Sequence, residues 1–318
     1  MADVITIDCG YLERDEFAAT YLITDGDRAA FIDNNTAFAV PRMLEALAGT
    51  GLMPEQVEFI IITHVHLDHA GGTSALASAC PNATILAHPR AARHIIDPSR
   101  LVASSMAVYG EDRFRAMYGD IQPVPEQRVR VMADDETVAL GRRPLRFIHT
   151  RGHANHHFCI VDGPNVFTGD AFGLRYPFLQ RDGTFVIPST SPTDFDGPLA
   201  RESILRIVDE RPQTVYPTHF GAVTDIDVAA GQLIRHLEFS EAVMLEAEAS
   251  DLPDDALQRY LQGRLSDYYR GLLDARGHLS ADPAAWDWLA NDIDLNAQGL
   301  AWVANKRRRK VRQAAAKH

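Results

Sequence analysis

The chain has 318 residues, 46% of them hydrophobic, which is enough for one large α/β domain with an additional segment or for two modest domains. Its 31 basic and 43 acidic side chains give a net charge of −12, which disfavours non-specific binding to nucleic acid and to anionic membranes. The three cysteines form no CxxC pair, so we expect a reducing compartment. With no signal peptide and no run of about 18 apolar residues, we expect a cytoplasmic protein.

Short apolar runs separated by turn residues predict strands in the first part of the chain, at 4–8, 20–24, 29–33, 59–62 and 84–87. The run 59–62 is continuously apolar, which is typical of a strand covered on both faces. Helical spacing of apolar residues predicts helices at 38–48 and 70–79. Residues 89–120 have mainly helical patterns between two strand patterns, so we interpret them as a candidate lid over a site.

Strand patterns resume at 128–132, 136–140, 145–149, 157–162 and 165–168. Residues 171–193 are rich in glycine, proline, serine and aromatic residues, which predicts a long irregular loop of the kind that often carries function. A helix at 199–210 and a strand at 214–216 follow. Beyond residue 225 only helices are predicted, at 228–248, 254–273 and 283–309. We therefore expect one domain at 1–225 and a helical extension at 226–318.

The strand at 59–62 leads directly into His64-Val65-His66-Leu67-Asp68-His69. Alternate residues that leave a strand point the same way, so His64 and His66 can converge on one ion. Asp68 and His69 fall at the turn into the next helix and face a second position nearby. Histidine and aspartate are ligands suited to zinc and also to iron or manganese. The segment therefore predicts a metal site.

The segment Thr63-His64-Val65-His66-Leu67-Asp68-His69-Ala70-Gly71-Gly72 resembles the THxHxDHxGG signature of the metallo-β-lactamase fold superfamily. The family's later elements are matched in order by Gly152-His153, Thr168-Gly169-Asp170 and Pro217-Thr218-His219. Arg151 stands where the family more often has proline, and Thr218 where glycine is frequent, but neither departure changes a ligand. The resemblance covers roughly residues 1–225. It implies an α/β fold, a four-layer αββα sandwich, followed here by the C-terminal helical extension.

The resemblance also implies a dinuclear metal site, with two Zn²⁺ ions as the first choice and iron or manganese as alternatives. The ligands it implies are His64, His66 and His153 for one ion, Asp68, His69 and His219 for the other, and Asp170 as the bridge. Each ion then keeps an open position, as catalytic sites do, and a water shared by two dications loses a proton near neutral pH. Asp68 is expected to orient this water and to carry its proton to the leaving group.

Other side chains are candidates for contacts behind the ligands or with substrate. His157 lies four residues after His153, as a second histidine often does in the family. The loop that begins directly after Asp170 must lie near the metals at its start. Its candidate pocket residues are Arg175, Tyr176, Phe178 and Arg181. Aromatic and guanidinium groups suit a substrate with an apolar body and an anionic end.

The first hypothesis for function is a hydrolase that acts on an ester, thioester, lactone or similar acyl bond of a small molecule, as the hydroxyacylglutathione hydrolase group does. A phosphodiesterase or nuclease is the alternative within hydrolases, but the acidic balance argues against a nuclease. A diiron protein that binds or reduces oxygen or nitric oxide is another alternative, but that branch typically has glutamate in place of His66. A binding module without catalysis is disfavoured by the complete ligand set.

The helical extension has two candidate uses, either as a cap over the pocket or as the interface of a homodimer. Its basic run at 306–310 is interpreted as a solvated helix end favoured by the helix dipole, with a nucleic-acid or phosphate contact as the alternative.

Overall fold

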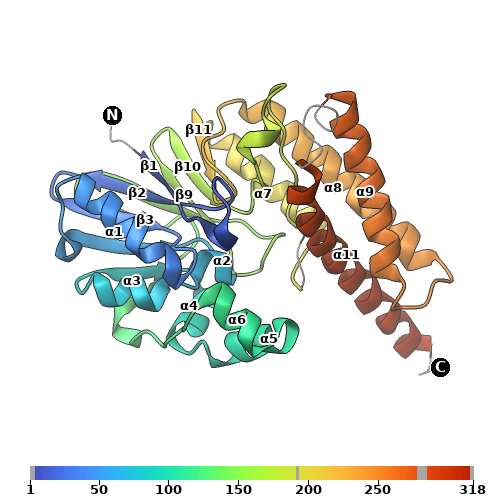
Figure 1. Ribbon diagram of the computed structural model, residues 1–318, viewed down its shortest axis with the longest axis horizontal. Coiled ribbons are helices and arrows are strands. Elements are labelled where there is room, and N and C mark those ends of the chain that lie inside the picture. Colours follow the sequence, from blue (N-terminus) through green and yellow to red (C-terminus); the bar gives the residue numbers. More distant parts are fainter. Residues whose placement is uncertain (1–3, 191–192, 278–284, 316–318) are drawn as a thin grey trace.

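The computed structural model describes residues 4–190, 193–277 and 285–315 and contains two β-sheets (Figure 1). The first sheet has six strands in the order β1 (Val4–Asp8), β2 (Ala19–Asp25), β3 (Arg28–Ile32), β4 (Val57–Ile62), β5 (Thr84–Ala87) and β6 (Val129–Val131). The second has five in the order β11 (Thr214–Pro217), β10 (Asn165–Gly169), β9 (Phe158–Asp162), β8 (Arg143–His149) and β7 (Thr137–Leu140). All eleven predicted strands are therefore present in this part of the chain.

The continuously apolar strand β4 shows how the layers are built. Ile60 and Ile62 pack into a core beneath α1 (Val40–Gly49), α3 (Thr73–Ala79) and α4 (Pro89–Ile96). Phe59 and Ile61 point the other way, into a core between the two sheets. Because side chains alternate along a strand, only an apolar run can supply both cores. A third core lies between the second sheet and the remaining helices, which completes the αββα order.

The other helices form two groups, one at the bottom of the view in Figure 1 and one on its right-hand side. The candidate lid consists of α4, α5 (Ser99–Tyr109) and α6 (Glu111–Tyr118). Helix α7 (Gly197–Asp209) packs on α8 (Ile226–Ala249), which packs in turn on α9 (Leu257–Ala275) and α11 (Ala285–Ala315). Apolar residues of all these C-terminal helices belong to the third core. The helices after residue 225 are thus continuous with the sandwich, and the division at 225 stays a prediction.

The helix predicted at 70–79 is present as α3, but it begins at Thr73 and not at residue 70. The structure has two short helices, α2 (Leu67–Ala70) and α3, separated by Gly71 and Gly72. A Cβ on Gly72 would lie 2.7 Å from the carbonyl oxygens of Asn34 and Thr36, so only glycine permits this close approach. The break leaves α2 as one turn that carries Asp68 and His69.

Two other expectations extend beyond the described residues. The start of the helix predicted at 283–309 lies outside them, and the helix is observed from residue 285 onward. Residues 191 and 192 of the predicted loop 171–193 also lie outside them. The described part of that loop contains one helical turn, Pro177–Leu179, and is otherwise irregular except for a bridge between Leu174 and Ile187. None of the helices described for this chain has an apolar stretch long enough to traverse a lipid bilayer.

Candidate metal centre

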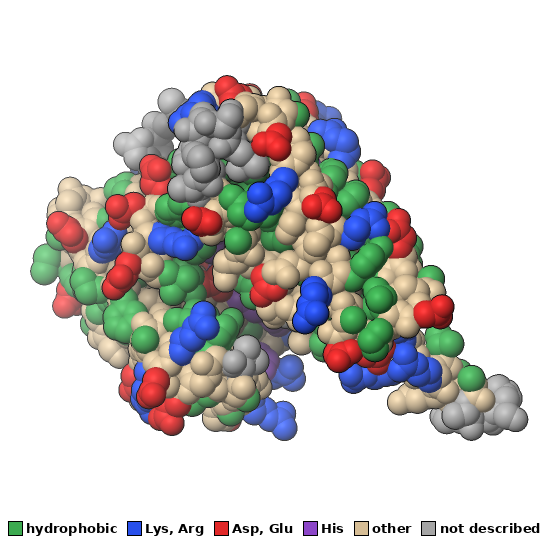
Figure 2. Space-filling view, turned by 45° about the vertical axis from the view of Figure 1, so that its right-hand side comes forward, with side chains coloured by type: hydrophobic (Ala, Val, Ile, Leu, Met, Phe, Trp, Pro, Cys, Tyr) green, Lys and Arg blue, Asp and Glu red, His purple; other side chains and the backbone are tan. Residues whose placement is uncertain are grey.

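The predicted ligands all follow the ends of strands. Residues 64–69 come after β4, His153 after β8, Asp170 after β10 and His219 after β11. The structure brings their donor atoms together in groups in which every donor lies within 4.8 Å of the others. Figure 2 shows histidine side chains in a hollow of the surface, and two members of these groups, His66 and Asp68, are partly exposed.

The first donor group contains three histidines. Nε2 of His64 lies 3.0 Å from Nδ1 of His66, and Nε2 of His153 lies 3.1 Å from each of these atoms. Two ligands of one tetrahedral zinc ion are about 3.3 Å apart when each zinc–nitrogen bond is about 2.0 Å. The three nitrogens therefore have the spacing of ligands to a single ion.

The second donor group contains Asp68, His69 and His219. Oδ2 of Asp68 lies 3.2 Å from Nε2 of His219 and 3.8 Å from Nε2 of His69. Asp170 stands between the two groups, with Oδ1 3.3 Å from Nε2 of His69 and Oδ2 3.6 Å from Nε2 of His153. The two oxygens of one carboxylate thus face different groups, as a bridging ligand requires.

Three of the five predicted ligand histidines, His69, His153 and His219, are oriented by a contact of the other ring nitrogen with Asp33 or with a backbone carbonyl. Nδ1 of His69 lies 2.8 Å from Oδ2 of Asp33, and Nδ1 of His219 lies 2.9 Å from the carbonyl oxygen of Phe17. Nδ1 of His153 lies 3.3 Å from the carbonyl oxygen of Ser189. Such contacts fix the ring and the tautomer, and they leave Nε2 with a lone pair directed at the centre.

Asp33 is the most connected of these orienting residues. It follows β3, is 1% exposed and has a φ of 54°, in the left-handed region that is unfavourable for most side chains. Its carboxylate also accepts hydrogen bonds from Thr63, through the backbone N–H and the hydroxyl, and from the hydroxyl of Thr218. Asp33 thus links the ends of β3, β4 and β11. Sequence reasoning missed it, although an aspartate at a predicted strand end was an available signal.

The electrostatics differ between the two donor groups. Burial and neighbouring histidines lower the pKa of His64 well below its usual value and that of His66 to about 4. Burial opposes the charge on His219, yet Asp68 and Asp170 raise its pKa to about 9. The first group is therefore a set of neutral imidazoles, whereas in the second carboxylates and imidazoles balance one another.

The chemistry of these donors fits metal ions. Nε2 of His69 and Oδ1 of Asp170 are buried and have no hydrogen-bond partner among the described residues. Buried polar atoms without partners cost free energy, which ligation of a cation would recover. Imidazole nitrogens and carboxylate oxygens in two groups, with a carboxylate between them, are ligands suited to zinc, iron or manganese.

His157 lies behind the donors and not at the open side. It is fully buried, and its Nδ1 lies 2.8 Å from the hydroxyl of Thr150. Its ring centroid is 4.9 Å from that of His64. A Cβ on Gly169 would lie 2.6 Å from Nε2 of His157, so a glycine before Asp170 makes room for this ring. The position fits contact with the ligands better than contact with substrate.

The candidate residues of the loop after Asp170 have different surroundings. The Tyr176 ring is 1% exposed and its centroid lies 6.5 Å from that of His219, and Phe178 stacks on Tyr176. Arg175 contributes through its backbone, since its N–H donates to the carbonyl of His219 and its carbonyl accepts from Phe220. Its guanidinium lies near Gly221, and Arg181 is exposed. The two aromatic residues are thus adjacent to the donors, whereas among the described residues neither guanidinium group forms a hydrogen bond or ion pair with a donor.

Residues from two other segments complete this side of the centre, and sequence reasoning missed them. Phe17, before β2, stacks on Tyr176 at 5.2 Å between ring centroids and meets His219 edge-on at 6.0 Å. Trp288 on α11 lies 5.8 Å from Phe17 and 4.8 Å from Phe178. Asp292, one helical turn after Trp288, accepts a hydrogen bond of 2.9 Å from the Tyr176 hydroxyl. We call Phe17, Tyr176, Phe178, Trp288 and Asp292 the aromatic wall.

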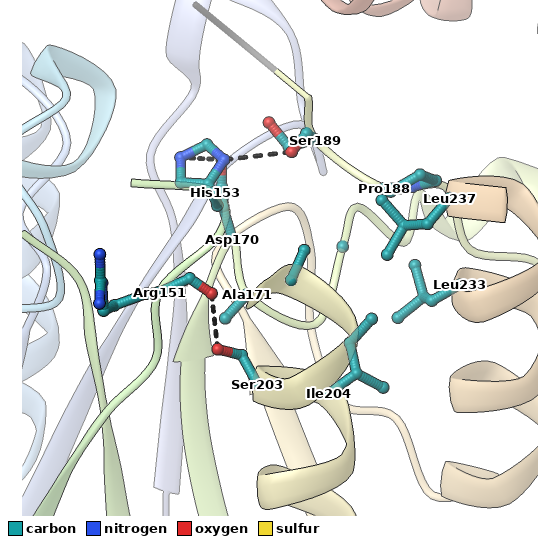
Figure 3. Close-up of a pocket in the computed structure, with 12 residues that line it drawn as sticks. Arg151, His153, Asp170, Ala171, Pro188, Ser189, Ser203, Ile204, Leu233 and Leu237 are labelled. Atoms are coloured by element: carbon teal, nitrogen blue, oxygen red, sulfur yellow. Dashed lines mark hydrogen bonds and ion pairs between the residues drawn. The ribbon is translucent and has the colours of Figure 1, made fainter. Parts of the chain in front are cut away.

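A small cavity lies beside His153 and Asp170, toward α7 and α8 (Figure 3). It is lined largely by apolar side chains, among them Ile204, Leu233 and Leu237. Its volume of about 10 Å³ has room for about one water molecule. A cavity of this size is too small to hold an organic molecule.

The fold and the donor set define a class of protein. Residues 14–219 match the sequence profile of the Metallo-beta-lactamase superfamily, and the chain belongs to this superfamily.

A metallo-beta-lactamase fold-containing protein of Sulfurisphaera tokodaii, ST1585, is 23% identical over 275 residues, which are 85% of this chain and 96% of that protein. The crystal structure of ST1585 has the same fold, with a TM-score of 0.63 at 22% identity over 94% of this chain and 98% of the other. The metallo-beta-lactamase family protein TTHA1429 from Thermus thermophilus gives a TM-score of 0.61 at 19% identity, over 97% and 93%. A hydroxyacylglutathione hydrolase of Albidiferax ferrireducens is 31% identical over 155 residues, but these are only 47% of this chain and 46% of the relative.

Proposed function

We propose that this protein is a dinuclear metal-dependent hydrolase that cleaves an ester, thioester, lactone or similar acyl bond of a small molecule. The observation that carries the proposal is the placement of Asp170, whose two oxygens face two separate groups of donors. When bound, two zinc ions would polarise an acyl carbonyl and activate water near neutral pH. His64, His66 and His153 would hold one ion, and Asp68, His69 and His219 the other.

The protein's own residues would position the substrate and move the proton. The side chain of Asp68 is 28% exposed, whereas that of Asp170 is 6% exposed and that of His219 is 7% exposed. Asp68 is therefore the carboxylate of the centre with access to both the donors and solvent, which suits a group that receives a proton and passes it to the leaving group. The similarity to a protein named hydroxyacylglutathione hydrolase supports acyl bonds as the first class to test.

The test combines elemental analysis with a substrate panel. Protein freed of metal with a chelator and then titrated with zinc is expected to take up about two equivalents. The panel contains chromogenic esters, thioesters, lactones and phosphodiesters of similar size. We expect activity that depends on zinc and is confined to acyl substrates.

Three outcomes would overturn the proposal. Uptake of about one equivalent of zinc would show that the site holds one ion and would contradict a dinuclear centre. Cleavage of phosphodiesters alone would contradict the proposed acyl substrates and indicate a phosphodiesterase. Iron in the purified protein with an iron absorption band, together with no hydrolysis, would instead favour redox chemistry.

A further inference from the structure

The four-residue helix α2 carries two members of the second donor group, Asp68 and His69. A single helical turn is not stable by itself, because it fixes several backbone angles in return for few hydrogen bonds. The place of these two donors therefore depends on contacts between α2 and other segments. The first donor group does not depend on this helix in the same way, since its three histidines follow the ends of β4 and β8.

The segment 34–36, which follows β3, holds α2 through its backbone. The N–H of Asn34 donates to the carbonyl of His69 at 2.9 Å, and the carbonyl of Asn35 accepts from the N–H of Gly72 at 3.0 Å. Gly72 permits this close approach, since a Cβ there would lie 2.7 Å from two backbone oxygens of the segment. The two stretches of chain are therefore in direct backbone contact along α2.

The side chain of Asn35 adds a contact to the helix itself. Its Nδ2 donates to the backbone carbonyl of Asp68 at 2.9 Å. Asn35 is 1% exposed and has a φ of 53°, in the left-handed region that glycine and asparagine adopt most readily. The neighbouring Asn34 donates instead to the hydroxyl of Thr73, at the start of α3. Asn35 is thus bonded to the turn that carries Asp68, and Asn34 to the helix that follows it.

The Asn35 amide uses only one of its two polar groups. Its Oδ1 is buried and has no hydrogen-bond partner among the described residues. A buried acceptor without a partner costs free energy comparable to what one hydrogen bond returns. The bond from Nδ2 and the unpaired Oδ1 therefore offset one another, and we expect the side chain to add little to the net stability of the fold. Its specific effect is on the place of Asp68.

We infer that Asn35 is a positioning residue for the second metal ion, because its amide fixes the turn that presents Asp68 and His69. Without this amide, the protein binds one ion tightly at the first donor group and the other ion only weakly. The inference rests on the proposed dinuclear function for the presence of two ions. It goes beyond that function by assigning separate support to the two donor groups and by naming a residue on which one of them depends.

The test is a zinc titration of the metal-free protein in competition with a chromogenic chelator of known affinity. Asn35→Gly removes the amide and keeps a residue that adopts the left-handed backbone without strain. We expect its affinity for the second equivalent of zinc to fall by about 10- to 100-fold and that for the first to stay within about threefold. The Tm of the metal-free variant should stay within about 4 °C of that of the unmodified protein. A general weakening of the fold would not give this split.

Two further variants complete the titration. Asn35→Asp has the size of asparagine and tolerates the left-handed region, but it lacks the donor, so it decides the case in which Asn35→Gly does not fold. Asn82→Asp is the matched control, because Nδ2 of Asn82 also donates to a backbone carbonyl, that of Glu55, at an exposed position. It should leave both affinities unchanged. Equal loss of both equivalents in the Asn35 variants, or no loss of the second, would overturn the inference.

A measurement on the metal-free protein separates this inference from the proposed function. Hydrogen exchange followed by NMR reports the opening of α2 through the amides of Ala70 and Gly71, which form its hydrogen bonds. In Asn35→Gly we expect their exchange to become about tenfold faster, as for the loss of one hydrogen bond, and that of the Leu76 and Cys80 amides at α3 to stay unchanged.

The two failures are then distinguishable. Uptake of two equivalents of zinc without any hydrolysis would refute the proposed hydrolase but not the role of Asn35, which the titration and the exchange decide. Unchanged exchange at Ala70 and Gly71 in Asn35→Gly would refute that role even if the protein is an active hydrolase.

Discussion

The donor groups and the aromatic wall are held in different ways. The donors follow strand ends, and three of the five ligand histidines are fixed at the second ring nitrogen by Asp33 or by a backbone carbonyl. The wall comes from three segments, namely the residues before β2, the loop after Asp170 and α11. Its contacts are mainly ring against ring, with one hydrogen bond between Tyr176 and Asp292.

This difference separates two tasks. Ligands must be placed within fractions of an ångström, which sheets and directional hydrogen bonds achieve. Recognition of an acyl group needs shape and charge, which packed aromatic side chains provide with less directional demand. Substitutions at the donors should therefore abolish metal binding, whereas substitutions in the wall should change the choice of substrate. Four predictions test this division, from the largest effect to the smallest.

Asp170→Ala tests the donors most directly. Loss of the carboxylate between the two groups is expected to release at least one ion and to lower kcat/KM by about a thousandfold or more, because activation of water and of the carbonyl both depend on the ions. Elemental analysis and the esterase assay measure the two effects. His149→Ala, whose Nε2 lies 3.0 Å from the Met132 carbonyl, is the control and should keep its metal. Retention of both ions and of full rate in Asp170→Ala would contradict the site.

Asp33→Asn tests the support behind the donors. The two carboxylate oxygens of Asp33 accept hydrogen bonds from His69, Thr63 and Thr218. In the asparagine variant one of these oxygens becomes an NH₂ group, which cannot accept, so metal affinity should fall by about 10- to 100-fold. Competition with a chelator of known affinity measures this change. Excess zinc should restore the rate, because the ligands themselves remain. An unchanged affinity would show that Asp33 contributes only to folding.

Trp288→Ala tests the wall. We expect KM for acyl substrates to rise by about tenfold as the ring contacts with Phe17 and Phe178 are lost, with the zinc content unchanged. Trp302→Ala is the matched control on the same helix, since Trp302 is 36% exposed and packs against Lys306. Loss of zinc in Trp288→Ala but not in Trp302→Ala would mean that the wall and the donors are one unit.

The pH dependence of stability gives the smallest effect. In the metal-free protein the folded-state pKa of Asp292 is about 7, raised from 3.8 by burial, with Asp170 and Asp68 adding to it and His219 opposing it. The contribution of this carboxyl group to stability is therefore full below about pH 4 and is lost as the pH rises to about 7. The Asp292→Asn variant lacks this dependence. The Tm of the variant minus that of the unmodified protein should therefore increase as the pH rises from about 4 to about 7. If the Tm values of the two proteins change with pH in parallel, the pKa of Asp292 is not raised and its carboxyl group is hydrated.

The sequence was informative where local pattern and function coincide. The strands 4–8 and 84–87 have their predicted bounds, because apolar runs between turn residues are a local signal. The convergence of His64, His66 and His153 followed from the resemblance to the superfamily, and the donor spacing agrees with it. The helix break at Gly71 and Gly72 was missed because its cause, the approach of the segment 34–36, is tertiary.

The aromatic wall was harder to predict for a related reason. Tyr176 and Phe178 were candidates because the chain connects them to Asp170. Trp288 and Asp292 are more than a hundred residues further along, in a helical pattern that reads as an ordinary amphipathic surface. Only the packing of α11 against the loop after Asp170 brings them to the centre. Sequence periodicity indicates that a helix has a buried face but not which element covers it.

The location of Trp288 and Asp292 on α11, apart from the strands that carry the donors, has an evolutionary consequence. We expect substitutions in this helix to leave the donor groups in place, so that substrate choice can change among relatives while the donor set is kept. A library restricted to the wall-facing turns of α11 is therefore an efficient starting point for directed evolution of altered selectivity.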